Sequence, residues 1–227
     1  METNADFGVA FDGDFDRCFF FDEKGNFING EYIIGLLAQI FLEKTSNEAV
    51  VHDNRVIWNC QDLISCYGGK SIISKTGHAF IKEQMRLHNA IYGGEISGHH
   101  YFRDFVYCDS GMIPFLLICE YLSKTDSKFS ELIEQRKERF LSSREINIRA
   151  ENFNFIKDEL LRRYEHECCS HDFLDGLSIS FEDWRLNLRP SNTEPFVRLN
   201  LETKVGKDHL SAKEREIFKV IHSIPLK

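Results

Sequence analysis

Three aspartates stand at alternate positions directly after an apolar run. Asp12, Asp14 and Asp16 follow the segment Phe7–Phe11, and Arg17 comes next. Such a run, ended by a turn, predicts a strand that would bring the three carboxylates to one place. Carboxylate oxygens are the ligands that Mg²⁺ and Ca²⁺ prefer, and a neighbouring arginine can hold a phosphate. The segment therefore predicts a divalent-cation site suited to phosphoryl chemistry.

Two other interpretations of this segment are weighed against it. An EF-hand loop also begins with acidic residues at alternate positions, and Glu23 would be its twelfth residue. Its sixth position should be glycine but is Arg17, and the following Cys18–Phe21 indicates a second strand. A hairpin with solvated charges is the other alternative. We favour the cation site, because three carboxylates this close repel one another unless a cation offsets them.

Two polar loops in the middle of the chain have residue types suited to a phosphorylated sugar. Lys75–His78 follows an apolar strand and opens a helix, so its backbone amides could meet an anion while Lys75 and His78 supply charge or protons. Glu95, Ser97 and His99 alternate in a glycine-containing loop. If that loop is extended, the three side chains face one way and could contact sugar hydroxyls. An ordinary helix start and a structural turn are the alternatives.

A fourth loop, Arg189–Pro195, has the composition of a phosphate cradle. It holds a guanidinium, two hydroxyls, an amide and backbone donors between two expected strands, and its candidate phosphate ligands are Arg189, Ser191, Asn192 and Thr193. A hairpin loop that uses proline, asparagine and serine for turn chemistry is the alternative.

Strand and helix signals alternate from residue 31 to about residue 138, which predicts an α/β domain with a parallel or mixed sheet. A long helix is expected over Glu31–Lys44, where apolar residues recur at helical spacing. Further helices are expected at about residues 55–67, 77–89 and 111–122, and strands at Ala49–His52, Ser71–Ile73 and Ala90–Tyr92.

A polar segment at Ser142–Arg144 marks the best domain boundary, and the pattern changes beyond it. The strands are grouped there, which predicts a smaller α+β domain. We expect helices at about residues 152–165 and 208–223, and strands near residues 145–148, 177–181, 184–188 and 196–202.

Composition limits the classes of partner. The formal charge of -8 argues against a nucleic-acid partner, because such binding needs basic faces. No apolar run approaches the roughly 20 residues that span a bilayer, so we expect a cytoplasmic protein without a membrane segment. A small anionic ligand would need local cations, and those in or near distinctive loops are Arg17, Lys75, His78, Arg189 and Arg198.

Taken together, the four loops resemble one family, the α-D-phosphohexomutases, in particular the bacterial phosphomannomutase and phosphoglucomutase branch. The motifs in order are Asp-Gly-Asp-Phe-Asp-Arg at 12–17, Lys-Thr-Gly-His at 75–78, Glu-Ile-Ser-Gly-His at 95–99 and Arg-Pro-Ser-Asn-Thr-Glu-Pro at 189–195. The resemblance runs over nearly the whole chain. It implies that residues 1–26 are a remnant of a metal-binding second domain, residues 27–140 a sugar-binding third domain and residues 141–227 a phosphate-binding fourth domain.

The resemblance implies a phosphomannomutase, an isomerase that converts mannose 6-phosphate to mannose 1-phosphate through a bisphosphate and leads towards GDP-mannose. The implied ligand is a phosphorylated hexose, mannose or glucose phosphate. The implied Mg²⁺ ligands are Asp12, Asp14 and Asp16, and the implied catalytic residues are Arg17, beside a phosphoserine, and His78. The implied sugar contacts are Glu95, Ser97 and His99, and the implied phosphate contacts are Arg189, Ser191, Asn192 and Thr193.

The sequence also departs from the family pattern. Family members carry the catalytic serine in a first domain, within a Thr-Ala-Ser-His-Asn-Pro type of loop, and no such loop occurs in these 227 residues. We therefore expect a truncated or split enzyme that is inactive alone and whose partner is a separately encoded amino-terminal portion bearing the serine. Two alternatives stay open: a non-catalytic sugar-phosphate-binding protein, and a protein that interacts with a full-length mutase.

Overall fold

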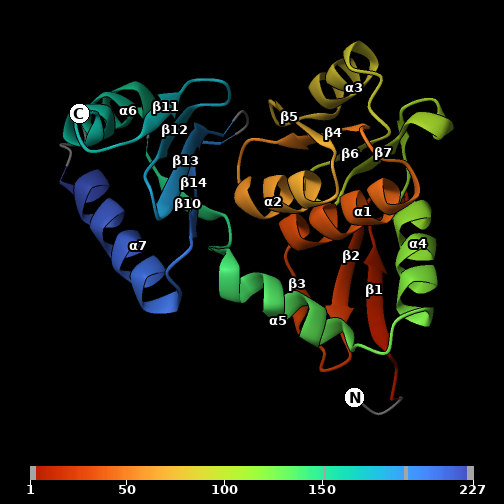
Figure 1. Ribbon diagram of the computed structural model, residues 1–227. Coiled ribbons are helices and arrows are strands. Elements are labelled where there is room, and N and C mark those ends of the chain that lie inside the picture. The colour runs from red at the N-terminus through yellow and green to blue at the C-terminus, as the bar shows by residue number, and fades with distance from the viewer. Residues whose placement is uncertain (1–3, 151, 192–193, 224–227) are drawn as a thin grey trace. The chain divides into compact units, whose positions relative to one another are not determined.

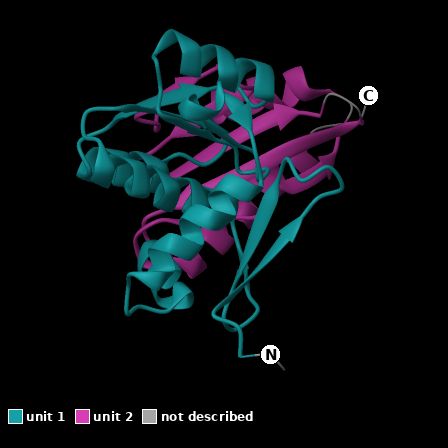
Figure 2. Cartoon of the chain, turned by 90° about the vertical axis from the view of Figure 1, so that its right-hand side faces the viewer, with its two compact units in different colours: residues 1–136 teal, residues 137–227 magenta. Residues whose placement is uncertain are grey.

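The computed structural model describes residues 4–150, 152–191 and 194–223 (Figure 1). The chain divides into two compact units, residues 1–136 and residues 137–227 (Figure 2). Each unit is described by itself below. Within the described ranges, no helix combines the length and the apolar character needed to cross a membrane.

Unit 1 begins with a small antiparallel sheet of three strands, β1 (Phe7–Phe11), β2 (Cys18–Asp22) and β3 (Phe27–Ile28), in the order β1-β2-β3. The expected strands on either side of the acidic loop are therefore confirmed. Phe11 pairs with Cys18, so residues 12–17 form the whole connection of a hairpin. The register places Asp12 directly at the end of β1.

The larger sheet of unit 1 is mixed, as expected. Its order is β5-β4-β6-β7-β8; the first three strands are parallel, and the last two run antiparallel to their neighbours. The strands are β4 (Ala49–Asp53), β5 (Lys70–Ser74), β6 (Tyr92–Gly94), β7 (His100–Phe102) and β8 (Cys108–Asp109). The parallel pairs come from the strand-helix-strand segments, and the short β7 and β8 follow a hairpin turn that the sequence analysis did not predict.

The helices of unit 1 cover the two sheets. They are α1 (Gly30–Lys44), α2 (Trp58–Cys66), α3 (His78–Leu87), the short 3₁₀ helix η1 (Arg103–Phe105), α4 (Met112–Ser123) and α5 (Phe129–Arg139), which continues into unit 2. Figure 1 shows α1 between the three-stranded and the five-stranded sheet and α3 on the other face of the latter. Accordingly, α1 shares one apolar core with Phe20 of β2 and Tyr92 of β6, whereas Ile81 and Met85 of α3 pack with Val51 in a second cluster.

Unit 2 has the expected α+β organisation. Its antiparallel sheet has the order β10-β14-β13-β12-β11, and β9 also pairs with β14. The elements are β9 (Leu141–Ser142), β10 (Ile146–Arg149), α6 (Phe153–Tyr164), β11 (Ser170–Asp172), β12 (Leu177–Ser180), β13 (Trp184–Pro190), β14 (Phe196–Thr203) and α7 (Lys207–His222). Apolar residues of α6 and α7 pack on the strands in a core of their own. The long pair of β13 and β14 ends at the loop that carries the expected phosphate ligands.

Candidate active site

The acidic loop between β1 and β2 brings its three carboxylates together. Ligand oxygens of Asp12, Asp14 and Asp16 all lie within 4.8 Å of one another. The loop turns sharply at Phe15, whose φ is 63°. Such a left-handed conformation is uncommon for a bulky residue. The Phe15 ring is held against Phe11, with ring centroids 5.4 Å apart. The alternate spacing thus produces the clustered oxygens that were expected from the sequence.

Arg17 binds back to the first aspartate of the loop. Its Nε donates to Asp12 Oδ2 at 2.6 Å, and its backbone N–H donates to Asp12 Oδ1 at 3.2 Å. Desolvation pushes the pKa of Asp12 up, but the hydrogen bonds from Arg17 outweigh it and bring the pKa to about 2. Asp12 is therefore a carboxylate at neutral pH, and Arg17 is fixed beside the cluster.

Asp16 differs from Asp12 although it belongs to the same loop. Its Oδ1 is buried and finds no hydrogen-bond partner among the described residues, and Arg17 Nε lies 3.7 Å from it, beyond hydrogen-bond distance. Partial loss of solvent raises the pKa of Asp16, and the carboxylates of Asp12 and Asp14 raise it further, against the effect of His99. A crowded carboxylate with an unpartnered oxygen is suited to a hard divalent cation, which would offset the repulsion.

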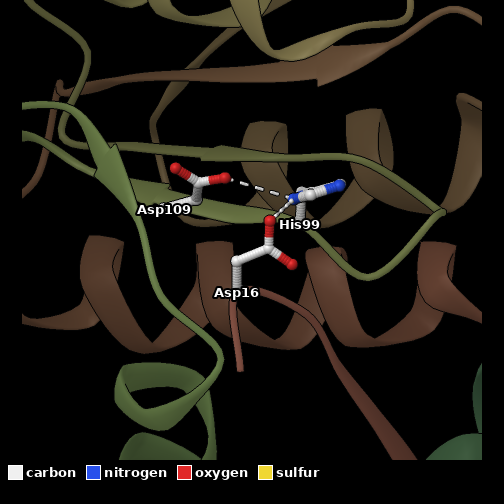
Figure 3. Close-up of side chains that lie close together, drawn as sticks. All are labelled: Asp16, His99 and Asp109. Atoms are coloured by element: carbon white, nitrogen blue, oxygen red, sulfur yellow. Dashed lines mark hydrogen bonds and ion pairs between the residues drawn. The ribbon is translucent and has the colours of Figure 1, made fainter. Parts of the chain in front are cut away.

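The 95–99 loop lies directly against the acidic loop. Cys18 N–H donates to the Gly98 carbonyl at 3.2 Å, and Arg17 and His99 form an isolated antiparallel bridge. His99 Nδ1 lies 3.8 Å from Asp16 Oδ2 and 3.2 Å from Asp109 Oδ2. Figure 3 shows both carboxylates directed at this ring nitrogen. Two of the motifs are thus brought together within unit 1.

Sequence reasoning missed two residues of this cluster. Asp109, on β8, accepts from Lys82 Nζ of α3 at 2.9 Å through its other oxygen, Oδ1. Burial raises the pKa of Asp109, but the hydrogen bond from Lys82 overcomes it, so the pKa is lowered. Neither residue belongs to a motif or a recurring spacing, and only the hairpin of β7 and β8 brings Asp109 beside His99. No signal in the sequence could have found the pair.

The expectation that Glu95, Ser97 and His99 face one way on an extended loop is wrong. Residues 95–98 form a turn, in which Gly98 N–H donates to the Glu95 carbonyl at 3.0 Å. Glu95 is 2% exposed, and its carboxylate accepts from Tyr101 Oη at 2.6 Å and from Gly77 N–H at 2.9 Å. Ser97 and His99 are partly exposed. The turn therefore separates the acidic residue of the motif from the other two.

The 75–78 loop has the expected position between a strand and a helix. β5 ends at Ser74, and α3 begins at His78. Gly77 has a φ of 122°, a conformation that favours glycine, and donates its N–H to Glu95. Lys75 and His78 are both exposed. The loop that was expected to contact an anion is therefore anchored to the 95–99 loop through Glu95.

The fourth motif lies in unit 2, where two arginines share one carboxylate. Arg189 of β13 pairs across the sheet with Arg198 of β14, and they donate to Glu145 Oε2 at 3.0 Å and Oε1 at 3.4 Å. Arg198 also lies 3.5 Å from Ser191 Oγ. Within the described ranges, the buried Nε atoms of both arginines have no hydrogen-bond partner. Two cations with spare donors are suited to an anion. The expected ligands Asn192 and Thr193 lie outside the described residues.

Comparison with known proteins agrees with this arrangement. The model of the alpha/beta/alpha domain III of phosphoglucomutase/phosphomannomutase matches residues 29–140, and the model of the C-terminal domain of the same family matches residues 145–220. A phosphomannomutase from Salmonella montevideo is 51% identical over 223 residues. The chain belongs to the phosphohexomutase family. The resemblance of its motifs to that family is thereby confirmed.

This phosphohexomutase chain spans about half the length of the curated relatives it matches. The alignment covers 98% of the chain but 49% of the Salmonella protein. The same proportion holds for a solved structure, a phosphoglucomutase/phosphomannomutase family protein from Burkholderia thailandensis, which is 25% identical with a TM-score of 0.83 and is covered to 47%. An N-acetylphosphoglucosamine mutase from Aspergillus fumigatus, solved with GlcNAc-6P and magnesium, is 14% identical with a TM-score of 0.63, covers 95% of this chain and is covered to 48%, and shows the same fold.

Proposed function

We propose that this chain carries the metal, sugar and phosphate sites of a phosphomannomutase, which interconverts mannose 6-phosphate and mannose 1-phosphate through a bisphosphate. The observation that carries the proposal is the convergence of two motifs in unit 1, where Asp16 of the acidic loop lies 3.8 Å from His99 of the sugar loop. Phosphoryl transfer depends on positioning and on a metal ion that neutralises the developing charge, and carboxylates beside the loop assigned to the sugar would hold such an ion next to the sugar. The name of the relative that is 51% identical supports the choice of mannose.

The acidic loop fits the Mg²⁺ that we assign to it. Asp12, Asp14 and Asp16 would hold the ion, and Asp16 Oδ1, which accepts no hydrogen bond from the described residues, would gain most from it. A bound Mg²⁺ supplies positive charge that offsets the negative charge of a transferring phosphoryl group. The magnesium in the structure of the fungal mutase supports this assignment.

The cationic and imidazole side chains have separate tasks in this proposal. Arg17 is held at the metal cluster by Asp12 and adds a guanidinium where the transferring phosphoryl group would lie. His99 directs Nδ1 towards Asp16 and Asp109, which leaves Nε2 to contact a sugar hydroxyl. His78 stays a candidate for proton transfer or phosphate contact, and its exposure suits either role.

The non-reacting phosphate is assigned to unit 2. Arg189 and Ser191 would contact it, together with Asn192 and Thr193, and Arg198 joins them because it is paired with Arg189 across the sheet. Glu145 holds both guanidiniums in place beside each other. A doubly charged phosphate would compete for the same donors.

The phosphoryl donor of the family, a phosphoserine, is not among the motifs of these 227 residues. We therefore expect the 227-residue chain to bind a sugar phosphate without turning it over when it is assayed alone. Ser97 is a poor substitute donor, because it belongs to the loop that we assign to the sugar rather than to the phosphoryl group.

The first testable prediction is the loss of sugar-phosphate affinity in Arg189→Ala. We expect this change to weaken the binding of mannose 1-phosphate by about 1.5 to 3 kcal/mol, the range for a hydrogen bond to a charged group. Titration calorimetry in the presence of Mg²⁺ measures the affinity. Arg215→Ala is the matched control, because Arg215 is an exposed arginine on α7 of the same unit. Equal affinities for mannose 1-phosphate in the wild type and in Arg189→Ala would reject the phosphate site.

A further inference from the structure

Tyr101 lies at the centre of the contacts between the polar loops of unit 1. It is the middle residue of β7 and is 0% exposed. Side chains alternate across a strand, so Tyr101 points to the opposite face from His100 and Phe102. Phe102 belongs to the core around α1, whereas Tyr101 packs with Ile81 and Met85 of α3. The tyrosine thus lies against α3 rather than against α1.

The hydroxyl of Tyr101 joins two loops through one carboxylate. It donates to Glu95 Oε1 at 2.6 Å, and Glu95 Oε2 accepts from Gly77 N–H at 2.9 Å. Glu95 is buried, and a buried carboxylate needs such donors to offset its lost hydration. Burial raises the pKa of Tyr101 far above its usual value, and the Glu95 carboxylate adds to this, so the phenol stays the donor. The position of Gly77 therefore depends on Glu95, and that of Glu95 on Tyr101.

The ring of Tyr101 contacts the other end of the same loop. It stacks on the His99 imidazole with centroids 6.1 Å apart and an interplanar angle of 17°. Lys82 Nζ lies 5.3 Å from the centroid of the Tyr101 ring and donates a hydrogen bond to Asp109. Asp109 in turn contacts His99. One side chain therefore supports both Glu95 and His99, the first and last residues of the sugar motif.

We propose that Tyr101 is a positioning residue whose hydroxyl, through Glu95, fixes the 75–78 loop and the 95–99 loop relative to each other. This link, from Tyr101 through Glu95 to Gly77, consists of contacts within unit 1. Its role in placing a sugar phosphate rests on the proposed function. A tyrosine that served only to fill the core would act through its ring. The hydroxyl can therefore be tested separately from the packing, because phenylalanine keeps the ring.

Tyr101→Phe with Tyr92→Phe as its matched control makes this test. Tyr92 is also 0% exposed, lies on the adjacent strand β6 and bonds through its hydroxyl to His100 Nδ1 at 2.7 Å. Each variant loses one buried hydroxyl from the same sheet, but only Tyr101 contacts Glu95. Hydrogen exchange of the Gly77 amide, followed by NMR, is the readout. We expect exchange about tenfold faster in Tyr101→Phe, since Glu95 loses the donor that holds it on the side of β7, and no change in Tyr92→Phe.

The affinity for mannose 1-phosphate, measured by calorimetry on the same variants, separates this inference from the proposed function. We expect about tenfold weaker binding in Tyr101→Phe and wild-type binding in Tyr92→Phe. Unchanged Gly77 exchange in Tyr101→Phe, or equal acceleration in both variants, overturns the link. Faster Gly77 exchange with unchanged affinity shows that the link has no positioning role and also overturns the proposal. If the wild type itself binds no mannose 1-phosphate, the function proposed above is wrong, while Gly77 exchange still decides whether the link exists.

Discussion

The two aspartates at the ends of the acidic motif have opposite electrostatic environments. Asp12 is held by Arg17, and its pKa is lowered to about 2. Asp16 has an unpartnered oxygen within the described chain, and its pKa is raised. Arg17 Nε therefore donates a hydrogen bond to Asp12 but lies 3.7 Å from Asp16 Oδ1, too far for one, so Asp16 is the less well compensated of the two carboxylates. At the scale of single residues, this asymmetry is the main reason for assigning a cation to the loop.

A second residue-scale property concerns the buried His100. Burial lowers its pKa to about 3, and His99 contributes to the lowering. In the unfolded chain an ordinary histidine titrates near 6.5. Between these two values the unfolded state binds the proton and the folded state does not. The stability that the neutral, buried His100 contributes is therefore complete above about pH 6.5 and falls as the pH falls below it. His100 thus makes unit 1 sensitive to mild acid.

We predict that His100→Gln flattens the pH dependence of unfolding between pH 7 and pH 5. The wild type should lose up to about 1.4 kcal/mol of unfolding free energy per pH unit through this one group once the pH is below 6.5. Urea unfolding at the two pH values measures the difference. His88→Gln, which changes an exposed histidine just after α3, serves as the control and should keep the wild-type slope. Identical slopes in His100→Gln and the wild type would mean that His100 accepts its proton in the folded state.

Sequence reasoning succeeded where the chemistry lies within one short segment. Asp12, Asp14 and Asp16 are brought together by a six-residue connection, so their spacing alone indicates the cluster. Arg189 and Ser191 stand at the end of a strand that could be recognised by its alternation. Asp109, Lys82 and Tyr101 come from three different elements, and their contacts depend on a hairpin of two short strands with little pattern of their own. The burial of Glu95 could not be predicted for the same reason.

At the scale of elements, short strands and close backbone approaches account for what the sequence did not predict. The expected strand at residues 90–92 is found at Tyr92–Gly94, because the hairpin to β7 continues its ladder into the glycines. β11 has three exposed residues and no apolar alternation. The long helices and the strands β13 and β14 were predicted because their apolar faces are buried in continuous cores. Buried periodic elements are therefore predictable, whereas the turns that join the loops are not.

Gly98 is the residue that allows the acidic hairpin and the sugar loop to approach. Its φ is 91°, and a Cβ atom there would lie 2.9 Å from Phe19 Cε1 and 3.2 Å from the Cys18 carbonyl oxygen. The Gly98 carbonyl also accepts the Cys18 N–H at 3.2 Å. A side chain at this position is therefore opposed both by the backbone conformation and by the neighbouring strand β2.

We predict that Gly98→Ala destabilises unit 1 by about 2 kcal/mol or more, because left-handed strain and a clash with β2 add. Gly68→Ala is the matched control: Gly68 has a φ of 71°, but no described atom lies within 4 Å of a Cβ placed there. The control should lose only about 1 kcal/mol of unfolding free energy, because it suffers the left-handed strain but no clash. Urea unfolding gives both values. Equal losses in the two variants would show that a Cβ atom at residue 98 meets no costly clash with β2.

At the scale of the whole molecule, each unit has its own core and its own part of the proposed chemistry. Unit 1 carries the acidic loop, the 75–78 loop and the 95–99 loop, and unit 2 carries the pair of Arg189 and Arg198. Unit 1 also has apolar surface with few partners. α4 is mostly apolar, yet its buried residues are only Pro114 and Ile118, while Met112 and Leu116 are 44% and 56% exposed. β1 lies at the edge of its sheet. Exposed apolar side chains gathered on one helix are suited to contact with another apolar surface.

The last prediction concerns the half of the relatives that this chain does not span. We expect the amino-terminal half of a related phosphomannomutase, expressed separately with its serine loop, to restore turnover of mannose 1-phosphate when it is added to the chain. It would supply the phosphoryl donor and a sheet neighbour for β1, and its association would bury the exposed apolar surface of unit 1. Turnover should rise with the concentration of the added half until the complex saturates, since the phosphoryl donor reaches this chain only when the two halves associate.

Three controls make the result of that experiment decisive. The chain without the added half should give no turnover in a coupled assay, and the complex should need Mg²⁺. Asp16→Asn should reduce turnover at least tenfold without preventing co-purification, because it removes a cation ligand but no apolar contact. If the two halves co-purify with a phosphorylated serine and Mg²⁺ but turn over no sugar phosphate, the retained loops bind without catalysing. The non-catalytic sugar-phosphate-binding alternative would then replace the proposal of a mutase, because the two halves would be associated and the phosphoryl donor present, yet no phosphoryl group would be transferred.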